Sequence, residues 1–132
     1  MSFLLDTDIC SAYLKGDRRL GERFIQYGGQ LHISAISAAE LFVWVLRAKA
    51  PRSRSLGLQM LLQDLASLEV NREVSRKFGE IRSLQLDQGL FTPEMDLLIA
   101  STALVNNLIL VTHNTQDFAH VAGLEVHDWL EE

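Results

Sequence analysis

Short apolar runs alternate with segments of helical periodicity along the whole chain, and this alternation constrains the fold more than any other feature. The clearest runs lie at residues 3–5, 31–33 and 108–111, with further candidates at 68–70 and 124–126. Neighbouring parallel strands need a helical crossover between them, so strands and helices in alternation predict a parallel sheet. We therefore expect an α/β fold with a mostly parallel central sheet and helices on both of its faces.

The expected helices occupy the segments between these runs, at residues 7–15, 17–27, 37–50, 54–67, 72–88 and 93–106. Ser37 and Glu40 have the spacing of a capping box, which predicts that the third helix begins at Ser37. Gly89 is expected to end the fifth helix. Thr92 followed by Pro93 predicts an N-cap residue with proline at the first position of the last helix.

The length of 132 residues fits one domain, and we expect a single unit over residues 1–132. Apolar residues make up 48% of the chain and charged residues 22%, which favours a well-filled core over disorder. The N-terminus lacks the pattern of a secretory signal and no apolar run reaches bilayer length, so we expect a cytoplasmic protein without a membrane span. Cys10 is the only cysteine, and we expect it to be a buried thiol.

The net charge of −5 gives no overall basic footprint for nucleic acid. One local exception is an island of cations at Arg47, Lys49, Arg52 and Arg54, where no acidic residue occurs between Glu40 and Asp64. This island is either a phosphate-facing surface or a solvated helix end and loop, and the pattern alone favours neither.

Acidic and amide side chains follow two of the predicted strands. Asp6 comes directly after residues 3–5, and Asn114 and Asp117 follow residues 108–111. The carboxyl ends of parallel strands share one edge of a sheet, and open α/β sheets bind their ligands at that edge. The sequence therefore predicts that Asp6 meets the loop of Asn114 and Asp117.

Each acid except Asp6 also has a purely structural explanation. Glu40 can close the capping box with Ser37, Asp96 can complement the positive end of its helix, and Asp117 can serve a turn. If the acids do converge, their mutual repulsion calls for a cation. Mg²⁺ or Mn²⁺ would suit oxygen donors without histidine or cysteine, and the four histidines show no ligand spacing.

Four segments in order resemble the PIN-domain family, and within it the VapC-type toxins of toxin-antitoxin pairs. They are Leu4-Leu5-Asp6-Thr7-Asp8-Ile9, Ile33-Ser34-Ala35-Ile36-Ser37-Ala38-Ala39-Glu40-Leu41, Asp96-Leu97-Leu98-Ile99-Ala100 and Leu110-Val111-Thr112-His113-Asn114-Thr115-Gln116-Asp117-Phe118. The resemblance spans almost the entire chain. It implies a PIN-like, Rossmann-like sandwich and a Mg²⁺- or Mn²⁺-dependent endoribonuclease.

The same resemblance implies the toxin of a type II pair, which hydrolyses RNA phosphodiester bonds and is inhibited by a cognate antitoxin. It also implies a homodimer, and a higher hetero-oligomer with the antitoxin. The helix around residues 41–46 is apolar on every side, so it must be buried by its own domain or by a partner. Phe42 and Trp44 are its best interface candidates.

Asp6, Glu40, Asp96 and Asp117 are the catalytic and metal-site acids that the resemblance implies. Many relatives carry an acid where this chain has Asn114, so Asp117 is the expected fourth acid and Asn114 ranks below it as an amide ligand. Thr7 and Thr112 are expected to orient the carboxylates. Asp8 lies where the family commonly has an amide, and the sequence assigns it no role.

Two other classes of function fit parts of the sequence. Asp6-Thr7-Asp8 after an apolar strand is similar to the start of a haloacid-dehalogenase-like phosphatase, in which Asp6 would be the nucleophile. Cys10, however, stands where that family has a hydroxyl residue. The third interpretation is a non-catalytic interaction module, in which the acids only stabilise helix starts.

Overall fold

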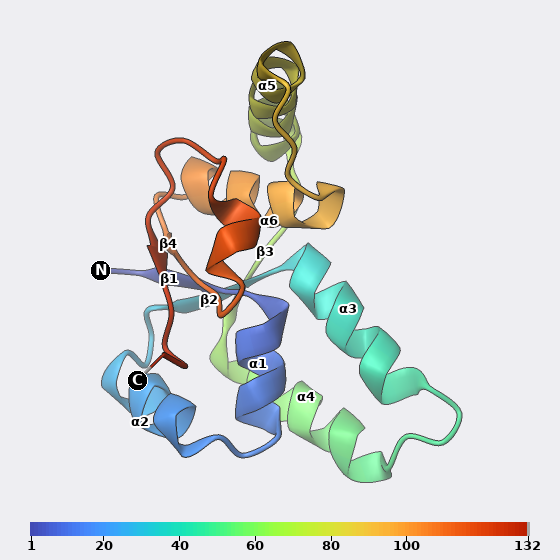
Figure 1. Ribbon diagram of the computed structural model, residues 1–132. Coiled ribbons are helices and arrows are strands. Elements are labelled where there is room, and N and C mark those ends of the chain that lie inside the picture. Colours follow the sequence, from blue (N-terminus) through green and yellow to red (C-terminus); the bar gives the residue numbers. More distant parts are fainter. Residues whose placement is uncertain (132) are drawn as a thin grey trace.

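A five-stranded parallel sheet forms the centre of the computed structural model, which describes residues 1–131 (Figure 1). The strands run in the order β3-β2-β1-β4-β5, and every neighbouring pair is parallel. Their bounds are β1 Phe3–Leu5, β2 Leu31–Ser34, β3 Ala66–Leu68, β4 Ile109–Val111 and β5 Val126–His127. The expected α/β class and parallel sheet are confirmed.

Helices cover both faces of this sheet. They are α1 Thr7–Leu14, α2 Arg18–Gln26, α3 Ala35–Leu46, α4 Arg52–Asp64, α5 Arg72–Gln88 and α6 Glu94–Val105, with the short 3₁₀-helix η1 at Thr115–Phe118. Figure 1 shows α1 to α4 on one side of the sheet and α6 on the other, with α5 standing beyond α6. Within the described residues, no helix is long and apolar enough to cross a bilayer.

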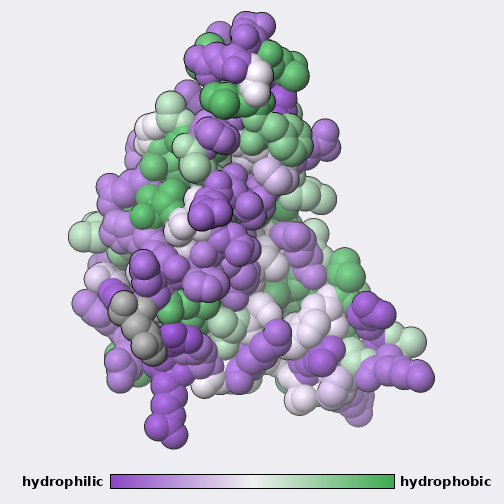
Figure 2. All heavy atoms as spheres, in the orientation of Figure 1, coloured by the Kyte–Doolittle hydropathy of each residue, from purple (hydrophilic) through white to green (hydrophobic). Residues whose placement is uncertain are grey.

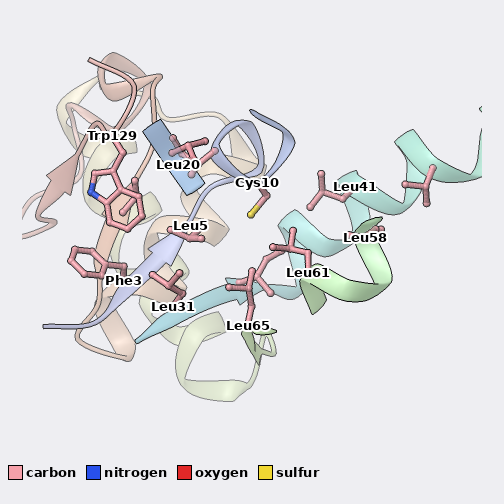
Figure 3. Packing of buried hydrophobic residues seen from close by; sticks show 14 residues of the cluster. Phe3, Leu5, Cys10, Leu20, Leu31, Leu41, Leu58, Leu61, Leu65 and Trp129 are labelled. Carbon is pink, nitrogen blue, oxygen red and sulfur yellow. The ribbon is translucent and has the colours of Figure 1, made fainter. Parts of the chain in front are cut away.

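The side chains of β1 point alternately to the two faces of the sheet, and a separate hydrophobic core lies on each face. Phe3 and Leu5 point into the larger core, whose members come from α1 to α4 and from Trp129 near the C-terminus (Figure 3). Leu4 points to the opposite face and packs against α6 residues such as Leu97 and Ile99. Successive side chains of a strand point to opposite faces, so a strand buried on both faces reads as a continuous apolar run.

Helix α3 begins at Ala35, two residues before the predicted position, and the prediction of a capping box of Ser37 and Glu40 is wrong. Ser34, the last residue of β2, is the N-cap, and its Oγ accepts a hydrogen bond of 3.1 Å from the backbone N–H of Ser37. The helix ends at Leu46 rather than near residue 50. A residue that precedes proline disfavours helical geometry, and Pro51 follows this segment. Glu40 therefore lies within α3, so capping does not explain its presence.

Of the boundaries predicted around α5 and α6, the end of α5 is confirmed and the start of α6 is wrong. The prediction of a helix over Arg72–Gln88 is confirmed, and Gly89 ends it with a φ of +69°, a left-handed conformation that glycine adopts without a Cβ penalty. Thr92 is not an N-cap. Its Oγ1 accepts a buried hydrogen bond of 2.9 Å from Gln85 Nε2, and Pro93 holds the cap position before Glu94.

The bounds of α4, β3 and β5 differ from the predicted ones by one to three residues. Helix α4 begins at Arg52 and ends at Asp64, so β3 comes earlier than the predicted residues 68–70. Strand β5 lies at Val126–His127 and overlaps the predicted 124–126 by one residue.

The topology places one switch point near the centre of the sheet. The chain builds β1, β2 and β3 outward in one direction and then returns to place β4 on the other side of β1. Leu5 pairs with Val111, so Asp6 and Thr112 leave the sheet side by side. The reversal of strand order between β1 and β4 is the position at which open α/β sheets bind ligands.

Candidate active site

Asp6 occupies the end of β1 and the N-cap of α1, where it is 6% exposed. Its Oδ1 accepts a hydrogen bond of 2.8 Å from the backbone N–H of Thr7, and its Oδ2 accepts one of 2.8 Å from Thr112 Oγ1. Burial raises the pKa of Asp6 to about 7, with a further contribution from the charge of Asp8, although both hydrogen bonds oppose the rise. The carboxyl is thus fixed in position and easily protonated near neutral pH.

Thr112 joins Asp6 to the loop that follows β4. Its side chain is fully buried and donates to Asp6, while its Oγ1 accepts a hydrogen bond of 3.1 Å from the backbone N–H of Asn114. Asn114 then starts η1, and its carbonyl accepts from the N–H of Asp117. The structure therefore brings this loop to the edge where Asp6 lies, as the topology predicts.

Glu40 reaches the same edge from the second turn of α3. Its Oε1 accepts a hydrogen bond of 2.6 Å from Thr7 Oγ1, and Thr7 Oγ1 lies 3.0 Å from the Oγ of the buried Ser37. Thr7 thereby holds α3 and α1 together beside Asp6. The early start of α3 at Ala35 positions Glu40 on the face that meets α1.

Asp96 lies in the first turn of α6, across the site from Glu40, and is partly exposed. Burial raises its pKa, and the charges of Asp117, Glu40 and Asp8 raise it further. Asp117 itself is exposed on η1. These electrostatic effects show that acids from α1, α3, α6 and η1 face one region, where the starts of α1, α3 and α6 converge in Figure 1.

Asp8 also belongs to this region, although no role was predicted for it. It lies in the first turn of α1, and its Oδ2 accepts a hydrogen bond of 3.0 Å from the backbone N–H of His113. Its Oδ1 is buried and has no hydrogen-bond partner within the described residues. Burial raises the pKa of Asp8. Its position two residues after Asp6 was the available signal, since both side chains emerge where β1 passes into α1.

Within residues 1–131 no lysine or arginine forms an ion pair with these acids. The ion pairs of lysine and arginine in this part of the chain involve Asp17 and Glu80 instead. Repulsion between neighbouring carboxylates is therefore uncompensated by the protein. An added cation would relieve it.

The chemistry of the site fits a hard divalent cation. All the candidate donors are carboxylate or amide oxygens, and Asp8 Oδ1 is a buried acceptor without a partner. Mg²⁺ and Mn²⁺ prefer oxygen donors of this kind. As the side chains stand, no group of three or more His, Cys, Asp or Glu within the described residues is arranged to hold a metal ion. The site therefore fits such a cation in the type of its donor atoms and in its negative charge, and not in the present arrangement of the side chains.

The side chains of three histidines have partners outside this group of acids, and the Cys10 thiol is buried. His113 Nδ1 is 2.9 Å from Asp128 Oδ2 and His127 Nε2 is 2.8 Å from Glu125 Oε2, while His32 faces a backbone carbonyl. Cys10 is fully buried, as predicted, and burial raises the pKa of its thiol. A thiol held in the neutral form is a poor nucleophile.

The apolar helix α3 is only half covered by its own chain. Leu41 and Val45 enter the core, whereas Phe42 is 44% and Leu46 72% exposed. Trp44 is partly buried, with the Arg54 guanidinium 4.6 Å from its ring centroid. Phe42 and Leu46 line a hollow of about 360 Å³ between α3 and α4. The chain alone therefore leaves part of α3 uncovered.

Comparison with known proteins gives a consistent set of relatives. Residues 3–124 match the family model of the PIN domain. The chain is 29% identical over 130 residues to a tRNA(fMet)-specific endonuclease VapC of Shigella flexneri, with 98% of each chain covered. It is 30% identical over 133 residues to ribonuclease VapC2 of Haemophilus influenzae, with 98% of this chain and 99% of the relative covered.

Solved structures show the same likeness. The crystal structure of VapBC2 from Rickettsia felis, bound to a DNA fragment from their promoter, contains a chain that superposes with a TM-score of 0.89 at 28% identity. The match covers 98% of this chain and 99% of that one.

Proposed function

Since this chain belongs to the PIN domain family, we propose that it is the endoribonuclease toxin of a type II toxin-antitoxin pair. It hydrolyses RNA phosphodiester bonds in the cytoplasm and is held inactive by a cognate antitoxin. The two relatives compared above are named as a ribonuclease and a tRNA endonuclease. Residues 1–132 would form one nuclease domain.

One observation carries the proposal: the charges of acids from four separate elements act on one another beside the switch point of the sheet, and within residues 1–131 no lysine or arginine forms an ion pair with them. Asp6 illustrates the consequence, because burial and Asp8 raise its pKa to about 7. A protein that keeps such a cluster loses stability to repulsion. Strongly perturbed carboxyls in a crevice are typical of functional sites.

The cofactor of this site would be Mg²⁺ or Mn²⁺, held by Asp6, Glu40 and Asp96 with Asp117 or Asn114 at the fourth position. When bound, such an ion supplies charge neutralisation and Lewis acidity at a phosphodiester. Metal ligands need carboxylates in their ionised form, so binding would release the proton that Asp6 holds near neutral pH. Metal affinity should therefore rise with pH through about 7.

The residues of the chain position this centre. The Thr112 hydroxyl and the Thr7 N–H fix the two oxygens of Asp6, and the Thr7 hydroxyl orients Glu40. Asp8 ties the loop after β4 to α1 through the N–H of His113. The oxygens that would hold a divalent cation are thus already oriented, which lowers the cost of forming the reactive arrangement.

The antitoxin and a second copy of the chain are the proposed protein partners. The solved complexes that resemble this chain are named VapBC. The exposed apolar residues Phe42 and Leu46 and the hollow beside them offer surface for such contacts. We propose a homodimer that joins the antitoxin in a larger hetero-oligomer.

The match of residues 3–124 to the PIN domain favours the nuclease over the phosphatase alternative. Cys10, which stands where a phosphatase of that kind has a hydroxyl residue, is fully buried. The test is to incubate the purified chain with structured RNA and, separately, with a small phosphomonoester, each with Mg²⁺ or with EDTA. We expect RNA fragments only with Mg²⁺ and no phosphate release. Phosphate release without RNA cleavage would overturn the proposal.

A further inference from the structure

Positive charge gathers at the far end of α3, away from the acids. Arg47 and Lys49 lie in the loop after α3, and Arg52 and Arg54 lie in the first turn of α4. We call these four residues the α3–α4 basic patch. They are a third of the 12 lysines and arginines of the chain, and residues 41–63 contain no acid.

The cations of this patch are not offset by acids. Within residues 1–131 the ion pairs of lysine and arginine are formed by Arg19, Arg76 and Lys77. None of the four patch residues takes part in an ion pair in this part of the chain. Their charge is thus directed to solvent, and the corner where α3 meets α4 is rich in hydrophilic residues at its surface (Figure 2).

The patch is hollowed rather than flat. Arg47, Lys49 and Arg54 line a hollow of about 470 Å³ together with Ala48 and Ala50, whose small side chains leave it open. Beside it, Trp44 lies between Arg54 and Lys15, whose charged groups are 4.6 Å and 6.0 Å from its ring centroid. Cations beside an aromatic ring are the combination by which proteins bind single-stranded nucleic acid.

Helix α3 joins the patch to the acidic site. Glu40 lies in this helix, and Arg47, the first patch residue, follows seven residues later, so at 1.5 Å per residue the patch begins about 10 Å from Glu40 along the helix axis. Among the described residues the charged side chains of the site are acids, and the net charge of the chain is −5. Apart from a bound metal ion, attraction for RNA phosphates would therefore come from cations elsewhere on the surface.

We propose that the α3–α4 basic patch binds the phosphate backbone of the RNA substrate outside the cleavage centre. The proposal rests on the proposed ribonuclease function. The contact is sequence-independent, since cations bind phosphates and not base edges. The patch increases the affinity for RNA, and the acids belong to the centre that cleaves it. An acidic protein segment would need the same cations, but α3 links this patch directly to the site where RNA must lie.

The test measures binding in EDTA, so that cleavage plays no part. A fluorescently labelled single-stranded RNA is titrated with the full chain and with the triple variant Arg47→Gln, Lys49→Gln, Arg54→Gln, and anisotropy is read at several salt concentrations. Each phosphate contact with a single strand contributes about 0.7 to the slope of log K against log salt. We expect the slope to become shallower by about 2 and binding at low salt to weaken about tenfold or more.

A matched control carries the same loss of three charges elsewhere: Arg18→Gln, Arg72→Gln, Arg76→Gln, on α2 and α5. It should bind RNA within about twofold of the wild type. Equal weakening in both triple variants would show a general charge effect and overturn the proposal. Thermal unfolding of each variant establishes that it is folded before binding is compared.

Two further arms separate the possible failures. Wild-type cleavage in Mg²⁺ tests the proposed function by itself, so cleavage that is unchanged in the patch variant, with unchanged binding, would overturn only the patch. A poly-glutamate peptide tests the other class of ligand. Binding of the peptide, but not RNA, to the patch would assign it to an acidic protein partner and overturn the RNA contact.

Discussion

Replacing Asp6 by asparagine should stabilise the metal-free protein at alkaline pH. The substitution keeps a side-chain oxygen that can accept the hydrogen bond from Thr7, and it removes the buried charge that burial and Asp8 disfavour. A functional acid that costs stability is the behaviour expected of a site built for a cation. Asp6→Asn therefore tests whether the charge of Asp6 destabilises the folded protein or whether Asp6 serves only as the N-cap of α1.

The size of the effect follows from the rise in the pKa of Asp6 from 3.8 to about 7. Between these values the folded chain keeps a proton that the unfolded chain has lost, so the free energy of unfolding falls as pH rises. The full difference corresponds to about 4 kcal/mol above pH 7, and to less than about 1 kcal/mol at pH 4. For a chain of this size, the variant should melt up to about 15 °C higher than the wild type at pH 8.

The assay is thermal unfolding in EDTA, followed by circular dichroism at pH 4, 6 and 8. The stabilisation by Asp6→Asn should grow through this range and level off above pH 7. Asp87→Asn removes an exposed charge on α5 and serves as the control, with no such trend expected. A variant that melts below the wild type at pH 8, or a difference that is the same at every pH, would refute the reasoning.

Three further substitutions test the parts around Asp6. Thr112→Val removes the hydrogen bond to Asp6, so it should lower the free energy of unfolding at pH 8 by about 1–3 kcal/mol in urea denaturation; an unchanged midpoint would contradict this contact. Asp8→Asn should lower the pKa of Asp6, which ¹³C NMR of the carboxyl would record, because Asp8 raises it. Ser34→Ala removes the cap that accepts from Ser37 and should cost about 1 kcal/mol, whereas Ser37→Ala should leave the start of α3 capped.

The elements with strong local signals were predictable from the sequence. Helix Arg72–Gln88 has a periodic apolar face, Asn71 as its N-cap and Gly89 after its end, and each signal is local. The position of Asp6 at the ligand edge followed from strand order alone, since a parallel sheet brings the ends of β1 and β4 together.

Tertiary contacts determine the helix starts that the local sequence leaves open. Ser34 and Ser37 are both good N-caps, and the choice depends on where β2 leaves the sheet. Thr92 has the form of a cap, but the buried amide of Gln85 needs a partner and takes its hydroxyl. A buried polar group without a partner is costly, so this pairing outweighs the local preference.

The candidate site was partly predictable for the same reason. Asp6 and the loop of Asn114 and Asp117 share an edge by topology, whereas Glu40 and Asp96 reach it only because α3 and α6 begin beside the strand ends. The sequence places Asp8 toward the same edge but does not settle its role, because the hydrogen bond that it accepts from the backbone N–H of His113 joins residues 105 apart in sequence.

The most direct test of the central claim is the rate of RNA cleavage by Asp96→Asn as Mn²⁺ is titrated, beside wild type and Asp87→Asn. Asp96 faces Asp117, Glu40 and Asp8, and Asp87 lies outside the site on α5. We expect Mn²⁺-dependent cleavage by wild type and Asp87→Asn, and a loss of about 100-fold or more in Asp96→Asn at every Mn²⁺ concentration. Cleavage by Asp96→Asn at the wild-type rate, in a folded protein, would contradict the account.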